Sequence, residues 1–206
     1  MIILLTGIPC SGKSTIMERL LSRLPEDPKE DIFEPIPFWK CREYGDILHV
    51  ESFPIKFEPS NQVFNGKEVI SAEKTIYHKP IEETFTIAPV ESFKYIPKFQ
   101  EFCNGVAIGY KHTLIECDRY WKNEELKWVL HNHESEVYLL TIDSGEEIRR
   151  HNERHNTQSE EDVVVRKKQM HNIENDINLM GRLNVRENNN IESSLRIEDE
   201  IYAKVI

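Results

Sequence analysis

The chain has 206 residues, 39% hydrophobic and 30% charged, which is enough for one α/β domain with a sizeable core. Its 36 acidic and 26 basic residues give a net charge of −10, which argues against binding long nucleic acid through a global basic face. No apolar run reaches the length of a membrane span, and the four cysteines form no C-x-x-C pair. We therefore expect one cytoplasmic domain over residues 1–206, with reduced thiols.

The first segment predicts a strand, a turn and a helix. Residues 2–5 are an apolar run of the kind found in a central strand that is buried on both faces. Residues 6–12 form a glycine-containing turn. Apolar residues then recur every three or four positions over residues 13–24, which predicts an amphipathic helix. Pro25 and Pro28 end it.

Residues 29–111 are expected to contain an antiparallel insertion. Alternating stretches at 38–42 and 47–50 flank Tyr44-Gly45-Asp46, which suits a hairpin. Further strand-like pieces lie around 62–64, 68–71 and 83–87, and Lys79-Pro80 separates two of them. A helix-like segment runs from Pro89 towards Cys103, with an interruption at Pro97.

The remainder alternates between strands and helices. We expect strands at 112–117, 136–142 and 183–186, and helices at 123–130, 144–155, 159–179 and 191–206. Such alternation predicts a three-layer α/β fold in which helices cover both faces of a mostly parallel sheet.

The turn after the first strand matches the phosphate-loop pattern G-x-x-x-x-G-K-[ST] at every fixed position. Its backbone N–H groups would form an anion-binding nest at a helix N-terminus. Lys13 would reach the β- and γ-phosphates of ATP, and the Ser14 hydroxyl would bind Mg²⁺. The predicted nucleotide-binding residues are Gly7, Pro9, Cys10, Ser11, Gly12, Lys13, Ser14 and Thr15.

Two carboxylates follow the strand at 112–117. Glu116 and Asp118 are two positions apart and would share a side of the chain at the carboxyl end of a strand, where α/β sheets bind ligands. We predict that Asp118 is the catalytic base and that Glu116 holds a magnesium water. The alternative is a structural ion pair between Glu116 and Arg119.

An arginine-rich helical hairpin is predicted over residues 144–179. Arg150 and Arg154 are four positions apart and share a helix face, so they could stabilise charge on a transferring γ-phosphoryl group. This hairpin would be a lid that excludes water. The alternative is a solvated pair of charged helices, because acidic residues interleave with the basic ones.

These motifs, in this order, resemble small P-loop kinases of the nucleotide kinase and polynucleotide kinase group. Asp118-Arg119-Tyr120 is similar to the segment of thymidylate and deoxynucleoside kinases that contacts magnesium and substrate. The run from His155 to Ile173 resembles the lids of phage-encoded kinases, some of which phosphorylate hydroxymethylated pyrimidines in DNA. The resemblance implies a P-loop kinase fold that uses ATP and Mg²⁺, in host cytoplasm if phage-encoded, with residues 186–190 flanking the adenine. It covers residues 1–24 and about 112–190. Residues 29–111 lie outside it, and we expect the substrate-recognition element there.

Three functions follow from these features. The first is an ATP-dependent kinase acting on a hydroxyl of a nucleic acid, best represented by a 5-hydroxymethyl pyrimidine in DNA. The second is a kinase of a free nucleotide, nucleoside or small metabolite, which the net charge favours mildly. The third is an ATPase or nucleotide switch, although the chain has no Asn-Lys-x-Asp guanine motif. The predicted acceptor-binding residues are Trp39, Arg42, Arg119 and Tyr120.

Overall fold

The computed structural model describes the backbone of residues 1–29, 33–36, 39–52, 55–56, 63–64, 67–72, 75–80, 86–87, 96–116, 123–153 and 160–206. It describes side chains in residues 1–29, 41–50, 99–116, 123–153 and 163–206.

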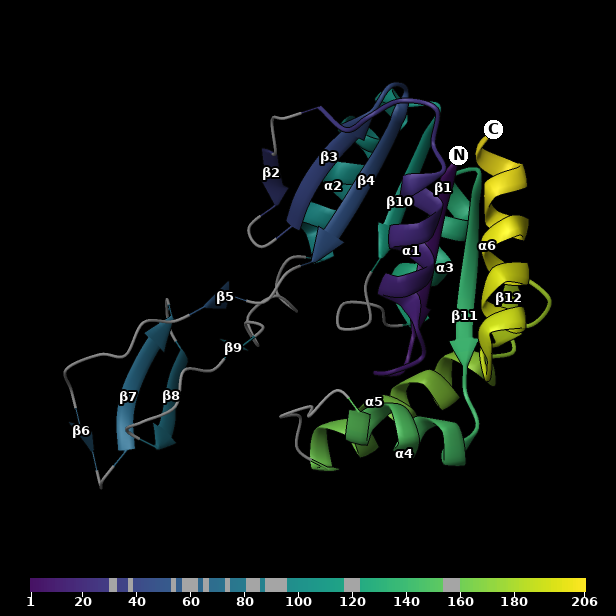
Figure 1. The fold of residues 1–206 in the computed structure, drawn as a ribbon. Helices are drawn as coiled ribbons and strands as arrows, with labels where there is room; N and C mark the ends of the chain where they lie inside the picture. Colours follow the sequence, from purple (N-terminus) through teal and green to yellow (C-terminus); the bar gives the residue numbers. More distant parts are fainter. Residues whose placement is uncertain are drawn as a thin grey trace.

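The main sheet has seven strands in the order β12-β11-β1-β10-β4-β3-β2 (Figure 1). The five strands from β12 to β4 pair in parallel, and β3 and β2 extend that edge through antiparallel pairs. The mostly parallel sheet predicted from the sequence is therefore confirmed. The strands are β1 (Ile2–Gly7), β2 (Phe33–Ile36), β3 (Trp39–Tyr44), β4 (Ile47–Ser52), β10 (His112–Glu116), β11 (Ser135–Thr141) and β12 (Leu183–Glu187).

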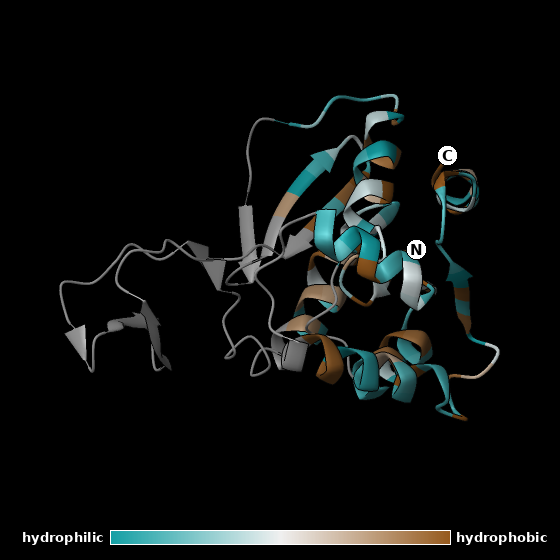
Figure 2. Cartoon of the chain, turned by 60° about the horizontal axis from the view of Figure 1, so that its bottom comes forward, coloured by the Kyte–Doolittle hydropathy of each residue, from teal (hydrophilic) through white to brown (hydrophobic). Residues whose placement is uncertain are grey.

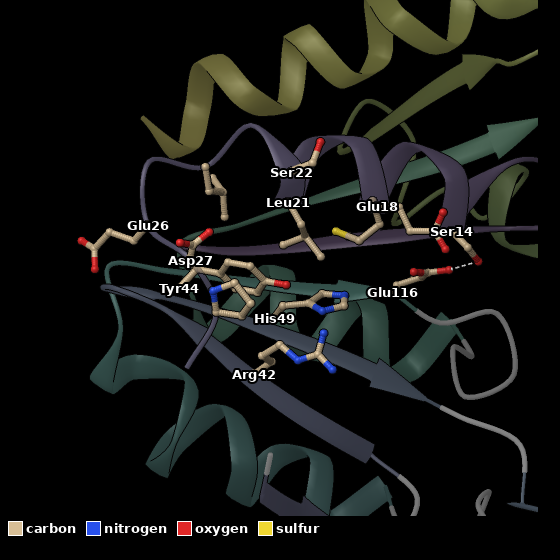
Figure 3. Close-up of a pocket in the computed structure, with 13 residues that line it drawn as sticks. Ser14, Glu18, Leu21, Ser22, Glu26, Asp27, Arg42, Tyr44, His49 and Glu116 are labelled. Carbon is tan, nitrogen blue, oxygen red and sulfur yellow. Dashed lines mark hydrogen bonds between the residues drawn. The ribbon is translucent and has the colours of Figure 1, made fainter. Parts of the chain in front are cut away.

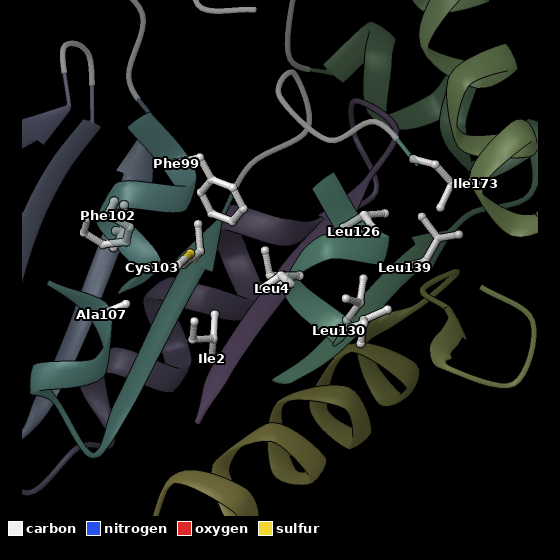
Figure 4. Packing of buried hydrophobic residues seen from close by; sticks show 14 of the residues in the cluster. Ile2, Leu4, Phe99, Phe102, Cys103, Ala107, Leu126, Leu130, Leu139 and Ile173 are labelled. Carbon is white, nitrogen blue, oxygen red and sulfur yellow. The ribbon is translucent and has the colours of Figure 1, made fainter. Parts of the chain in front are cut away.

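Helices cover both faces of this sheet. Alternate side chains of the buried strand β1 point to opposite faces, so they show which helices pack on each one. Ile3 and Leu5 pack with α1 (Lys13–Ser22) and α6 (Ile191–Val205). Ile2 and Leu4 pack with α2 (Ile96–Gly105), α3 (Asn123–Asn132) and α5 (Glu160–Glu174) (Figure 4). In Figure 2, α6 is seen nearly end-on and carries hydrophobic residues on one side. The three-layer α/β architecture is confirmed.

Helices α4 (Ser144–Glu153) and α5 form the predicted helix pair after β11 (Figure 1). Lys167 of α5 and Glu147 of α4 are joined by a 2.6 Å ion pair. Helix α5 ends at Glu174, five residues before the predicted end. The backbone N–H of Asn175 still donates to His171, but that of Asp176 donates to Ile173, three residues back, and that of Asn178 donates to the Asp176 side chain, so the α-helical pattern stops there.

The predicted hairpin is confirmed as β3 and β4, but it is part of the main sheet, because β4 pairs in parallel with β10. Antiparallel strands also occur between β4 and α2. Strand β5 (Ile55–Lys56) pairs with β9 (Thr86–Ile87), and β7 (Lys67–Ala72) pairs with β6 (Val63–Phe64) and with β8 (Thr75–Pro80). Strands β2, β5 and β8 were not predicted. A short 3₁₀ helix, Ala107–Gly109, precedes β10.

Pro97 does not interrupt helix α2, contrary to the prediction, and the part of the predicted helical segment over residues 89–95 lies outside the described residues. Pro97 is the second residue of α2, where a proline is tolerated because the first N–H groups of a helix have no intrahelical acceptor. Among the segments that the structure describes, no helix combines the length and apolar composition that crossing a bilayer requires.

Candidate phosphate-binding site

The phosphate loop joins β1 to α1 through a backbone that only certain residues can follow. Gly7 and Gly12 have φ angles of 151° and 88°, and Cys10 has a φ of 64°. A Cβ atom at Gly12 would lie 2.4 Å from the side-chain nitrogen of Asn188, and one at Gly7 would lie 2.5 Å from the carbonyl oxygen of Leu140. Both glycines are therefore required by conformation and by close packing.

Helix α1 starts at the end of this loop, and no side chain of the described residues caps its first N–H groups. Its N-cap is Gly12, and its first turn carries no acidic residue. The first N–H groups of a helix lack intrahelical acceptors and lie at the positive end of the helix dipole. The loop thus presents the anion-binding environment that the sequence motif predicts.

Lys13 is buried and lies over the loop. Its Nζ atom donates to the carbonyl oxygens of Gly7 and Ile8, both at 2.9 Å. These contacts keep an ammonium group within the concave side of the loop, where it can exchange carbonyl oxygens for phosphate oxygens.

Ser14 and Glu116 are in contact at the carboxyl end of the sheet. Ser14 is the second residue of α1 and Glu116 is the last residue of β10, and the Ser14 hydroxyl donates to Glu116 Oε1 at 2.5 Å. A hydroxyl and a carboxylate are the hard oxygen donors that Mg²⁺ prefers, so these two residues fit the predicted magnesium site. Within the described ranges, no group of three or more His, Cys, Asp and Glu residues is arranged to hold a metal.

Arg150 connects α4 to the phosphate loop. Its guanidinium donates to the carbonyl oxygen of Cys10 at 3.3 Å, to the carbonyl oxygen of Asn188 at 2.8 Å and to Glu146 at 2.6 Å. Its neighbour Arg149 is half exposed and forms ion pairs with Glu146 and Glu153 of its own helix. Arg149, and then Arg150, lowers the pKa of Glu146 to about 2 through these hydrogen bonds. In α4, one arginine therefore lies at the phosphate loop and the other lies in a solvated charged face.

Asn188 is a site residue that the motifs did not reveal. It follows β12 and is 1% exposed, and its side-chain nitrogen donates to the carbonyl oxygen of Ser11 at 2.7 Å. Its backbone N–H donates to Thr141. The resemblance placed residues 186–190 beside an adenine, whereas Asn188 itself contacts the phosphate loop. A run of three asparagines was the signal in the sequence, and it carries no recognised motif.

Two cavities lie on either side of the start of α1. One, of about 280 Å³, is lined by Gly12 and Thr15 together with residues of α4 and of the loop before α6. The other, of about 580 Å³, begins at Ser14 and Glu116 and continues between α1 and the β3–β4 hairpin, where Arg42 lines it (Figure 3). The phosphate loop thus has separate spaces beside it for two different groups.

The structure brings together all the predicted loop residues with Glu116 and Arg150, and it places Arg42 in the larger cavity. Asp118, Arg119, Tyr120 and Arg154 lie outside the described residues, as does the side chain of Trp39. Their predicted roles, and the alternative ion pair between Glu116 and Arg119, therefore stay predictions.

Comparisons with known proteins add a distant likeness. No model of a protein family matches the sequence, and no curated protein matches it. Among solved structures, a gluconokinase from Sinorhizobium meliloti 1021 is similar over 98% of this chain and 95% of its own, with 10% identity and a TM-score of 0.46. A likeness at this level assigns no activity to this chain.

Proposed function

We propose that this protein is an ATP-dependent phosphotransferase that phosphorylates a hydroxyl group of a small acceptor. The observation that carries the proposal is the position of the phosphate loop between two cavities, with Lys13 over the loop and Ser14 beside Glu116. A nucleotide with its phosphates on the loop has room for its base in the cavity next to Thr15. The acceptor then approaches from the larger cavity, on the side of Ser14.

The transfer step needs positioning and charge stabilisation more than covalent chemistry. The acceptor oxygen bonds to the γ-phosphorus while the bond to the β,γ-bridging oxygen breaks, and that electron pair leaves with ADP. The acceptor's proton passes to a base, for which Asp118 remains the predicted residue. Lys13 and Arg150 lie where they can offset charge on the phosphates. Mg²⁺, when bound by Ser14 and Glu116, would neutralise charge on the β- and γ-phosphate oxygens.

The character of the larger cavity favours a small acceptor over DNA. It is closed on two sides by α1 and the hairpin, and acidic side chains outnumber basic ones among the lining residues that the structure describes. Acidic walls repel a polyanion. The DNA acceptor depends mainly on aromatic and basic residues outside the described ranges, so it stays a prediction. Arg42 is compatible with either acceptor.

Transfer of label from γ-³²P-ATP tests the proposal. The acceptors are a mixture of small alcohols, free nucleosides and nucleotides, and oligonucleotides that carry 5-hydroxymethyl pyrimidines. We expect label on a small molecule with the unmodified protein and far less with Lys13→Ala. Label on the oligonucleotide alone would show that the acceptor is DNA and not a small molecule. The kinase proposal would be contradicted if the protein hydrolysed ATP steadily and none of the acceptors changed the rate of hydrolysis.

A further inference from the structure

The residues that line the larger cavity indicate which chemical groups the acceptor carries. It runs from Ser14 and Glu116, where the proposed transfer takes place, along α1 to the turn that follows this helix. Its opposite wall is the β3–β4 hairpin, from which Arg42 and His49 face α1 (Figure 3). These two residues lie directly across from each other in the antiparallel pair. A molecule that fills the cavity therefore meets both of them on one side.

Arg42 is a half-buried cation on this wall of the cavity. Among the residues that the structure describes, none forms a hydrogen bond or an ion pair with its guanidinium. Other arginines near the phosphate loop, such as Arg19 and Arg150, each bond to a carboxylate. Removing a charged group from water is costly unless an opposite charge and hydrogen bonds compensate it. The guanidinium fork suits a planar or tetrahedral oxyanion.

His49 provides an independent sign that a ligand completes this wall. The residue is 6% exposed, and its Nε2 atom is buried without a hydrogen-bond partner among the described residues. Burial, and then the nearby Arg42 guanidinium, lowers the pKa of His49 to about 4, so the ring is neutral at pH 7. Buried polar atoms are almost always paired, and an unpaired one requires an explanation. A ligand bound to Arg42 would lie beside this ring.

The rest of the lining limits the ligand's charge. Glu18, Glu26, Asp27 and Glu116 contribute carboxylates, and Arg42 is the one guanidinium or ammonium among the described lining residues. A ligand with many negative charges would be repelled by four carboxylates. Hydroxyl groups, in contrast, can donate hydrogen bonds to carboxylates. The wall thus suits one anionic group on an otherwise hydroxylated molecule.

We propose that the acceptor is a small alcohol carrying one oxyanion group, a carboxylate or a phosphate monoester, which binds Arg42 beside His49. This inference rests on the proposed phosphotransferase function, and it names the acceptor's class. The acceptor's reacting hydroxyl would then lie towards Ser14 and Glu116, and its remaining hydroxyls would face the acidic residues of α1 and the following turn.

The test measures binding at the cavity wall and does not require the physiological acceptor. The imidazole resonances of His49, identified by their loss in His49→Gln, are followed by NMR in the full chain. The probes are D-glycerate, glycerol 3-phosphate and glycerol, each titrated into the tens of millimolar. We expect at least one of the two anions to shift the His49 resonances with saturation and glycerol not to do so. Comparison of the two anions separates a carboxylate from a phosphate.

The same titration with Arg42→Gln should weaken anion binding by about tenfold or more, because a charge-assisted pair is lost. Arg196→Gln, on an exposed position of α6, is the matched control and should bind as the unmodified protein does. Unfolding by urea checks that each variant is folded. Anion shifts that are absent, that equal those of glycerol, or that persist unchanged in Arg42→Gln would overturn the inference.

ATP binding by the same samples separates this inference from the function on which it rests. ATP affinity should be equal in Arg42→Gln and the unmodified protein, and it should be lower in Lys13→Ala. If ATP does not bind the unmodified protein, the phosphotransferase proposal fails whatever the anions do. If ATP binds but the anions do not affect His49, only the acceptor class is wrong.

Discussion

The side-chain amide of Asn188 donates a 2.7 Å hydrogen bond to the carbonyl oxygen of Ser11 and so connects the loop after β12 to the middle of the phosphate loop. The same side chain lies against Gly12, where a Cβ atom would be 2.4 Å away. The conformation of the phosphate loop is therefore supported by a residue far away in the sequence, and this contact can be tested.

Asn188→Ala should destabilise the protein by about 1–3 kcal/mol, because it leaves the buried carbonyl of Ser11 unpaired. It should also raise the Kd for ATP, since the loop loses a support. Urea unfolding and ATP titration measure the two effects. Asn104→Ala, on an exposed position of α2, serves as the control. Equal effects of the two substitutions would show that the contact does not support the loop.

Lys13→Ala should lower kcat for phosphate transfer by about a hundredfold to a thousandfold, the usual consequence of removing one donor to transition-state charge. The Lys13 ammonium lies between the carbonyl oxygens of Gly7 and Ile8, so its removal also changes the loop. Label transfer from γ-³²P-ATP gives the rate. The exposed Lys111→Ala should keep full activity. If Lys13→Ala transferred phosphate at the normal rate, the phosphate loop would have no part in the transfer.

Glu116→Gln should raise the Mg²⁺ concentration needed for half-maximal activity by about tenfold or more, because a carboxylate is a stronger Mg²⁺ ligand than an amide. The measurement is activity against total Mg²⁺ at saturating ATP. The control is Glu101→Gln on the exposed side of α2. An unchanged magnesium dependence would mean that the pairing of Glu116 with Ser14 is only structural.

Arg150→Ala should lower kcat more than it raises the KM for ATP if its guanidinium acts on charge that develops during transfer. Its contacts with Cys10 and Asn188 place it at the loop, whereas Arg149 forms ion pairs with Glu146 and Glu153 of its own helix. Arg149→Ala should therefore have the smaller effect in steady-state kinetics. A larger loss in Arg149→Ala would reverse this assignment of the two arginines.

The pKa of His49, lowered to about 4 by burial and by Arg42, makes stability depend on pH. The folded state binds the proton less readily than the unfolded state, so this contribution is complete above about pH 6.5 and is lost as the pH falls towards 4. The loss should reach about 3 kcal/mol in the free energy of unfolding. Urea unfolding from pH 7 to pH 4 measures it.

His49→Gln should remove this part of the pH dependence, while the exposed His131→Gln should keep it. The difference between the two variants isolates His49 from other groups that titrate in the same range, such as His112 and His133, whose pKa values burial also lowers. Parallel stability curves for the two variants would contradict the assignment.

Local patterns in the sequence were enough to predict the layers of the fold and the phosphate loop. The apolar run at Ile2–Leu5 and the spacing in α1 depend on neighbours in the chain, and both elements formed as predicted. Strand β4 was predicted as part of a hairpin, but its parallel pairing with β10 depends on contacts between distant segments. The position of Asn188 is likewise set by the order of strands, which no local pattern contains.

The side chains of the larger cavity could also be predicted only in part from the sequence. Arg42 could be selected from the sequence because it is basic and lies among aromatic residues. His49 could not, because its significance comes from burial and from the cross-strand position opposite Arg42.

The pairing of β4 with β10 has a consequence for how this protein could change in evolution. Strand β10 ends at Glu116, beside the phosphate loop, and β4 and β3 carry His49 and Arg42 on the next two strands of the same sheet. The residues that choose the acceptor and those that handle the phosphate are thus held by one hydrogen-bonded framework but lie on separate strands. Exchanging side chains on the hairpin could redirect the protein to a new alcohol while the phosphate-handling residues stay in place.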